Sequence, residues 1–209
     1  MKPEEILEEI SVEVSTCTLC ELHHSRNVAV PGEGPENSEI MFIGEGPGFH
    51  ENEQGRPFVG AAGKFLEELL TKIDLSREQV FITNVVKCRP PGNRDPQPEE
   101  VETCTKTYLD RQIQAINPKV FVTLGRFSMN LLIPNTKISN VHGQSYKIKG
   151  RLVVPMYHPA AALHQGSLRS VIEEDFKKLP QLIAKVGESL NQQEGEMDRE
   201  QEPKQLSLF

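Results

Sequence analysis

The chain lacks any apolar run of the roughly 20 residues needed to cross a bilayer. Its first residues also lack the charged, apolar and small-residue succession of a secretory signal peptide. These two absences predict a cytoplasmic protein without a membrane anchor. The 209 residues, with their mixed apolar and charged composition, suit one compact domain with tails.

An excess of positive charge is also missing, since the formal net charge is −7. This total does not exclude a nucleic-acid partner, because the charge is unevenly distributed. Residues 1–13 and residues 187–209 each carry a net charge of −4, which leaves +1 for the body between them. A basic face on the body is therefore compatible with the acidic total.

Cysteine is scarce, and its four positions are Cys17, Cys20, Cys88 and Cys104. In a cytosolic chain, structural disulfides are disfavoured, so the C-x-x-C pair indicates a redox motif or a metal site. A redox pair would follow a strand, whereas this pair precedes the first expected strand. Zinc usually takes two C-x-x-C knuckles, but fifteen residues separate the last two cysteines. The spacing favours an iron–sulfur cubane, with zinc and unligated core cysteines as the alternatives.

Short apolar, β-branched runs alternate with segments of helical periodicity along the chain. Strands are expected at residues 39–44, 80–86 and 119–125, with a hairpin within 141–154. Helices are expected at residues 3–10, 61–73, 98–115, 126–132 and 168–185. The alternation predicts an α/β protein, a three-layer α/β/α sandwich with a mostly parallel sheet of about four strands.

The first expected strand ends in a glycine-rich turn that carries one acid, Gly44-Glu45-Gly46-Pro47-Gly48. Glycines leave the backbone open to close approach by a ligand. Ligands of open α/β sheets bind at the carboxyl ends of the strands. The turn therefore indicates a binding site, and a plain corner between strand and loop is the alternative.

Three other side chains suit the same edge of the sheet. Phe58 follows a proline in a loop and is either a plate for a flat ligand or a core residue. Asn84 interrupts a β-branched run, where a buried amide needs partners; a ligand could supply them, unless the side chain turns outward. His158 stands before Pro159 at a strand end, where helix continuation is disfavoured, although a lone histidine is more often structural than catalytic.

Taken together, four motifs and the cysteine pattern resemble the family 4 uracil-DNA glycosylases, from about residue 17 to about residue 182. The motifs are Gly44-Glu45-Gly46-Pro47-Gly48, Arg56-Pro57-Phe58-Val59-Gly60, Thr83-Asn84-Val85-Val86-Lys87-Cys88-Arg89-Pro90-Pro91 and His158-Pro159-Ala160-Ala161. The resemblance implies a uracil-DNA glycosylase-like sandwich with a 4Fe–4S cluster. The chain departs from many relatives at Gly46, where they have alanine. A covalently trapping relative has a Lys-Arg-Arg-Ile-His insertion and a histidine in place of Cys88, and this chain has neither.

The resemblance also implies roles in taking uracil out of DNA and cutting its N-glycosidic bond. Phe58 would stack on the base and Asn84 would pair with its polar edge. His158 and the backbone at Gly44 and Gly46 would stabilise the charge developing on the leaving base, and Glu45 would position water or offset the sugar cation. Candidate DNA contacts are Lys87, Arg89, Arg94, Leu163, His164 and Arg169.

Two other classes of function are also compatible with the sequence. One is a non-catalytic iron–sulfur DNA-binding module of the same fold, which would not need Glu45, Asn84 and His158 together. The other is a metal-dependent hydrolase, for which the pair His23-His24 is the one hint. The presence of all three site residues favours the enzyme, with uracil-containing DNA as its partner and the monomer as its expected state.

The glycosylase domain is expected to span residues 1–186. Residues 187–204 are poor in apolar side chains and predict a disordered acidic linker. The last residues, Gln205-Leu206-Ser207-Leu208-Phe209, resemble the peptide by which bacterial repair proteins bind the sliding clamp; a merely sticky terminus is the alternative. Gln205 would hydrogen-bond there, and Leu206, Leu208 and Phe209 would supply the apolar contacts. The ending predicts a bacterial, nucleoid-associated enzyme.

Overall fold

A computed structural model describes the backbone of residues 1–200 and the side chains of residues 1–184. The expected clamp peptide, Gln205, Leu206, Leu208 and Phe209 included, lies outside the described residues, as do linker residues 201–204. Within residues 1–200, every helix is too short or too polar to cross a membrane.

A five-stranded sheet in the order β2-β1-β3-β5-β4 forms the centre of the molecule. The strands are β1 (Ile40–Gly44), β2 (Phe81–Asn84), β3 (Val120–Leu124), β4 (Tyr146–Ile148) and β5 (Arg151–Met156). β1, β2, β3 and β5 are parallel, and β4 pairs antiparallel with β5. The predicted α/β sandwich is confirmed, and the strand beyond the expected four is the short edge strand of the hairpin.

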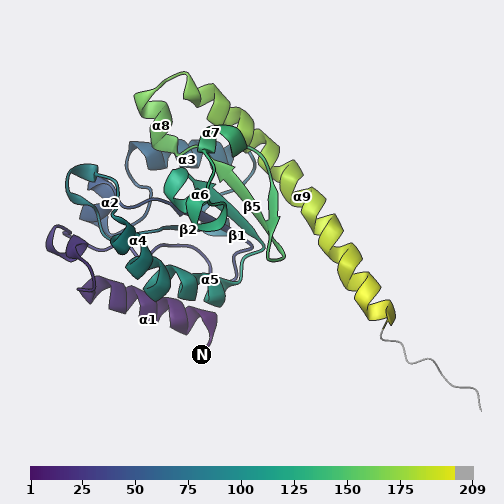
Figure 1. The fold of residues 1–209 in the computed structure, drawn as a ribbon, viewed down its shortest axis with the longest axis horizontal. Coiled ribbons are helices and arrows are strands. Elements are labelled where there is room, and N and C mark those ends of the chain that lie inside the picture. The colour runs from purple at the N-terminus through teal and green to yellow at the C-terminus, as the bar shows by residue number, and fades with distance from the viewer. Residues whose placement is uncertain (201–209) are drawn as a thin grey trace, which may run out of the picture.

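Helices cover both faces of the sheet (Figure 1). Their bounds are α1 (Pro3–Thr16), α2 (Phe49–Gln54), α3 (Ala61–Thr71), α4 (Pro98–Cys104), α5 (Asp110–Ile116), α6 (Arg126–Leu132), α7 (Ile138–Val141), α8 (Pro159–His164) and α9 (Leu168–Glu200). A π-helical segment, Thr105–Leu109, joins α4 to α5, so the helix expected at 98–115 continues through a local widening. The short helices α2, α7 and α8 were not expected from the sequence.

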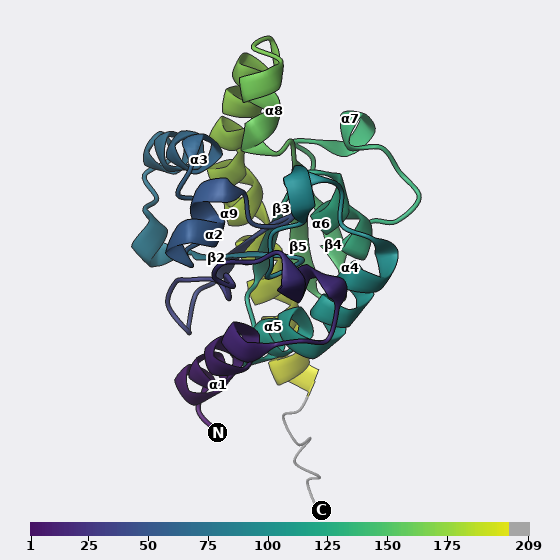
Figure 2. The same cartoon turned by 90° about the vertical axis from the view of Figure 1, so that its left-hand side faces the viewer.

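Alternation along the strands divides the interior into two cores, because successive side chains point to opposite faces. Phe42 of β1 faces α3 and α9, and its ring stacks on Phe176 with the centroids 6.2 Å apart. Its neighbours Met41 and Ile43 face the other core, to which α1 and α5 contribute. Figure 2 shows α1 and α5 below the strands and α3 above them, whereas α9 passes behind the strands. The two cores hold the sheet fixed, so its carboxyl edge is a rigid base for a site.

Helix α9 continues to Glu200 and projects from the body (Figure 1). Residues 187–200 are thus helical, where we expected a disordered linker over 187–204. Glutamate, glutamine, methionine and arginine are good helix formers, and this composition extends a helix that packing on the sheet has already started. The low content of apolar residues therefore does not exclude a helix in residues 187–200.

Candidate functional site

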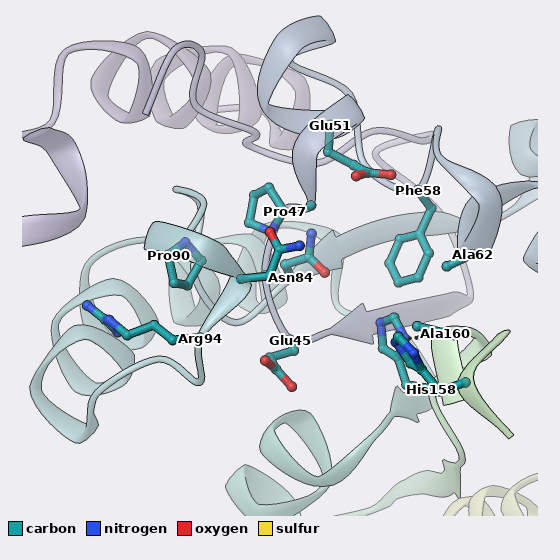
Figure 3. A pocket seen from close by; sticks show the side chains of 14 residues that line it. Glu45, Pro47, Glu51, Phe58, Ala62, Asn84, Pro90, Arg94, His158 and Ala160 are labelled. Carbon is teal, nitrogen blue, oxygen red and sulfur yellow. Dashed lines mark hydrogen bonds between the residues drawn. The ribbon is translucent and has the colours of Figure 1, made fainter. Parts of the chain in front are cut away.

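The carboxyl ends of β1, β2 and β5 meet at one edge of the sheet, where they border a cavity of about 360 Å³. Five of the residues expected to bind the base or act on it line the cavity: Glu45, Gly46, Phe58, Asn84 and His158. Figure 3 shows the side chains of Glu45, Phe58, Asn84 and His158 pointing into the same space. The structure therefore brings together residues that are up to 113 positions apart in the chain.

Gly44 forms the floor beneath two of these side chains. It lies opposite Asn84 in the register of β1 and β2. A Cβ atom on residue 44 would lie 2.3 Å from Asn84 Oδ1 and 2.7 Å from the Phe58 ring. Both distances are shorter than any van der Waals contact, so only glycine lets the amide and the ring approach the strand end.

Phe58 is buried, and its backbone is left-handed with φ of 52°, a conformation that is uncommon for a residue other than glycine. Arg77 supports the loop by donating hydrogen bonds to the carbonyls of Pro57 (2.6 Å) and Phe58 (2.9 Å). From the other side, Glu51 accepts the backbone N–H groups of Val59 and Gly60, both at 2.8 Å. These contacts hold the ring as a fixed wall of the cavity.

Arg77 and Glu51 are the supporting residues that sequence reasoning missed. Arg77 also pairs with Glu33, which binds Arg56 as well (2.8 Å). Burial acts to raise the pKa of Glu33, but the two guanidinium groups outweigh it and lower that pKa. The positions of Arg77 and Glu51 relative to Phe58 match no sequence motif. The one available signal was the closeness of Glu51 to the loop that carries Phe58.

Asn84 is 2% exposed, and its side-chain amide makes no hydrogen bond to another side chain or backbone group of residues 1–184. The amide borders the cavity, where its polar atoms are open to solvent until a ligand enters. Its donor and acceptor face the cavity, so a flat ligand with an amide-like edge can satisfy both.

Lys87 was expected to contact phosphate, and the structure contradicts this because the residue is 1% exposed. Its ammonium donates to Thr83 Oγ1 (2.6 Å), Asn84 O (2.9 Å) and Gln112 Oε1 (2.7 Å). Three acceptors match the three donors of an ammonium, which makes the inward orientation possible. Burial lowers the pKa of Lys87 to about 8. Lys87 therefore fixes the end of β2 at which Asn84 stands.

His158 is the N-cap of α8, and its Nδ1 accepts the N–H of Ala160 at 3.1 Å. In the neutral ring the proton consequently sits on Nε2, which can donate to a ligand. Burial lowers the pKa of His158 to about 4, although the charge of Glu51 acts to raise it. The ring stacks on Phe58 with the centroids 5.4 Å apart. The site thus contains a neutral hydrogen-bond donor in a fixed orientation.

Glu45 is half-buried at the rim of the cavity. Burial raises its pKa above the usual range, Asp95 acts in the same direction, and Arg126 opposes them. Arg126 forms an ion pair with Asp95. The carboxylate of Glu45 therefore lies near a second acid, Asp95, and near Arg126, which is paired with that acid.

The remaining expected DNA contacts lie at different distances from the cavity. Arg94 and His164 line it, and Arg94 also donates to both oxygens of Glu100 (2.9 and 2.7 Å). Leu163 is 51% exposed beside His164 on α8. Arg169 lies on α9, bound to Glu68 (2.6 Å) and outside the cavity lining. Arg94 and His164 thus border the cavity, Leu163 is next to His164 in the chain, and Arg169 and Lys87 lie outside the lining.

All four cysteines line a second, apolar cavity together with Val14, Leu19, Leu22 and Tyr108. They are free thiols. Two donors point at their sulfurs: Arg26 Nη1 lies 3.4 Å from Cys88 Sγ, and the Lys87 N–H lies 3.3 Å from Cys104 Sγ. Burial raises the pKa of Cys104 to about 12, so cationic charge is needed to hold it as a thiolate.

Within residues 1–184, no three histidine, cysteine or acidic side chains converge closely enough to hold a single metal ion. The hydrolase alternative therefore gains no support from His23 and His24, of which His23 Nδ1 contacts Cys20 O at 2.8 Å. Four soft sulfur donors around one apolar cavity instead fit a larger group bound by four thiolates.

Residues 31–181 match the model of the uracil DNA glycosylase superfamily. The chain is 52% identical over 186 residues to a type-4 uracil-DNA glycosylase of Sulfurisphaera tokodaii, covering 84% of each protein. It is 49% identical over 190 residues to the type-4 enzyme of Archaeoglobus fulgidus, covering 87% of this chain and 95% of the relative. A third type-4 enzyme, from Thermotoga maritima, is 44% identical over 189 residues, covering 88% and 98%.

The protonation of His158 gives a direct test of the site geometry. We expect its imidazole to titrate near pH 4 by NMR, with the proton of the neutral ring on Nε2. The unfolded residue titrates near pH 6.5, so the unfolded chain binds more protons between those values. The free energy of unfolding should therefore fall as the pH falls from about 6.5 to about 4. His158→Gln assigns the resonance and should remove this part of the slope; an imidazole that titrates at or above pH 6.5 would contradict the geometry.

Proposed function

The chain belongs to the type-4 uracil-DNA glycosylases of the uracil DNA glycosylase superfamily, and on that premise we propose how its site removes uracil from DNA. It is a DNA repair enzyme, so the alternative of a non-catalytic module is set aside. The observation that carries the proposal is the unpartnered Asn84 amide in one cavity with the Phe58 ring, Glu45 and His158. The target uridine leaves the base stack, enters this cavity and loses its base, which yields free uracil and an abasic site.

Phe58 and Asn84 read the base. The Phe58 ring stacks on one face of the uracil, and Asn84 pairs with its N3–H and O4. Cytosine presents an acceptor at N3 and an amino group at C4, so both hydrogen bonds to Asn84 would be mismatched. A buried polar group left unpaired costs about 1–3 kcal/mol, which is enough to discriminate strongly between the two bases.

His158 stabilises the leaving group. As the N-glycosidic bond breaks, the uracil takes the bonding electrons and negative charge develops on O2. The Nε2–H of the neutral imidazole donates to that oxygen, together with the backbone N–H of the glycine turn at Gly46. One well-placed donor of this kind contributes roughly 3 kcal/mol of transition-state stabilisation. Because burial lowers the pKa of His158 to about 4, the ring needs no proton transfer before it acts.

Glu45 acts at the sugar. Its carboxylate, at the rim next to the bound nucleotide, either orients the water that attacks C1′ or offsets the positive charge of the sugar. The water oxygen forms the new bond to C1′, and one of its protons leaves to the carboxylate or to solvent.

DNA outside the cavity contacts the rim. Arg89, Arg94, His164 and Arg169 would contact backbone phosphates, and Leu163 would fill the space that the flipped base leaves. Such contacts weaken with added salt, because phosphate binding releases counterions.

The second cavity is the proposed cofactor site. Cys17, Cys20, Cys88 and Cys104 would ligate a 4Fe–4S cluster. When bound, the cluster supplies four iron–thiolate bonds that join the segment after α1, the end of β2 and α4. The Arg26 guanidinium and the Lys87 N–H would then donate to two of the thiolates. This set of donors fits thiolate ligation, which needs nearby positive charge.

We predict that the purified protein is brown and contains about four iron atoms per chain, with a broad visible absorption from sulfur-to-iron charge transfer. Cys88→Ser should lower the iron content and the thermal midpoint, because it loosens the segment that ties the cluster to β2. Thr103→Ser, at the same cavity, is the control and should keep both. Stoichiometric zinc without iron would overturn the assignment.

Two variants, studied under single-turnover conditions, should separate recognition of the base from cleavage of the N-glycosidic bond. His158→Ala should slow uracil excision at least tenfold, equivalent to about 1.4 kcal/mol of lost stabilisation. Asn84→Asp should weaken the preference for uracil over cytosine, because the carboxylate offers no donor to O4. Asn140→Asp makes the same change at an exposed position and should excise at the parent rate. Parent-like excision by both site variants would refute the roles given to them.

For residues 205–209, we propose the sliding clamp of bacterial replication as the partner. The expected monomeric enzyme would be held there while its catalytic body samples DNA, which would place it at the nucleoid. Deleting Gln205 to Phe209 should abolish capture by immobilised clamp and leave excision from a short free oligonucleotide unchanged. A variant with the same five residues in scrambled order is the control for composition. Clamp capture that survives the deletion would rule the peptide out.

A further inference from the structure

Phe49 is an exposed aromatic side chain at the mouth of the uracil cavity. It begins α2 directly after Gly48, which lines the cavity. Its side chain is 54% exposed, whereas every other phenylalanine and tyrosine among residues 1–184 is buried or half-buried. Neither the base-reading residues nor the rim contacts described above account for this exposure.

The surroundings of Phe49 are polar and cationic. The Arg89 guanidinium lies over the ring, 5.3 Å from its centroid. Arg89 Nε donates to Asn93 Oδ1 at 2.7 Å, and Asn93 itself lines the cavity. His50 meets the ring edge-on, with the centroids 5.5 Å apart. The ring therefore has a guanidinium over one face and an imidazole at a steep angle to it.

We propose that Phe49 and Arg89 form a stacking site for the nucleobase next to the flipped uracil in the same DNA strand. This inference rests on the proposed function, because a flipped nucleotide must bring its neighbour to the cavity mouth. Flipping removes one stacking partner from that neighbouring base. The Phe49 ring offers a replacement π-face, as aromatic side chains do in proteins that bind single strands. Arg89 adds a cation–π contact and a positive charge for the strand.

A nucleobase fits this place better than a protein segment does. The platform is a single ring with an arginine and an asparagine beside it, and these last two come from the loop that also forms the cavity rim. Leu163, the other exposed apolar residue beside the cavity, is aliphatic and offers no π-face. Leu163 can fill the gap that the flipped base leaves in the duplex, and Phe49 can stack on the neighbouring base. The two exposed side chains thus have different partners in one strand.

The test removes the neighbouring base and the aromatic ring separately and together. Binding is measured to oligonucleotides that carry an uncleavable 2′-fluorinated deoxyuridine, with either a normal base or a tetrahydrofuran abasic residue next to it, on each side in turn. With the base present, Phe49→Ala should weaken binding about tenfold. With that base missing on the stacking side, parent and Phe49→Ala should bind equally. Phe49→Tyr keeps a ring and should bind as the parent does, whereas Phe49→Leu should behave like Phe49→Ala.

A fluorescent reporter makes the same contact visible. A 2-aminopurine in the neighbouring position should be quenched on binding to the parent protein and not on binding to Phe49→Ala. Val12→Ala, which truncates a 69% exposed side chain on α1, should leave affinity and quenching unchanged. An equal loss of binding with and without the neighbouring base, on both sides, would overturn the stacking site while uracil excision by the parent upheld the proposed function. Absence of excision by the parent would overturn the proposed function itself.

Discussion

The close approach of Gly44 to the Asn84 amide and the Phe58 ring determines the geometry of the base cavity. Parallel pairing of β1 and β2 puts residues 44 and 84 opposite each other. With a side chain on residue 44, the amide and the ring could not both remain there. The amide and the ring can both approach the end of β1 because residue 44 has no side chain.

Two cations, the buried Lys87 and the half-buried Arg77, connect these positions to the rest of the molecule. Arg77 binds the carbonyls of the Phe58 loop, and Lys87 binds the carbonyl of Asn84. Lys87 also links the two cavities, because its backbone N–H contacts Cys104 Sγ while its ammonium holds the end of β2. The segment of residues 84–88 therefore borders both cavities, with Asn84 at one and Cys88 at the other.

Most of the correct predictions came from local patterns in the sequence. The apolar runs located β1, β2 and β3. Glu45 was identified in the glycine turn after β1, Asn84 as an amide that interrupts a β-branched run, and His158 by its place before Pro159 at a strand end. Lys87 was assigned wrongly because a lysine in a basic, proline-rich stretch suggests solvent, and only the tertiary structure supplies its three acceptors. Glu51 and Arg77 were missed for a related reason: they act on backbone groups, which carry no sequence signature. Phe49 was passed over because an aromatic next to a glycine turn is ordinarily a core residue.

The left-handed backbone at Phe58 has an evolutionary consequence. For an L-residue, this conformation costs roughly 1–2 kcal/mol, and it persists because Arg77 and Glu51 hold the loop from both sides. Losing either support would leave the ring in a conformation that the remaining contacts no longer favour, so the effects of substitutions at these three positions should not add. The three residues form an epistatic group. A substitution at one of the three positions is disfavoured while the other two residues are kept, so we expect changes at these positions to occur together.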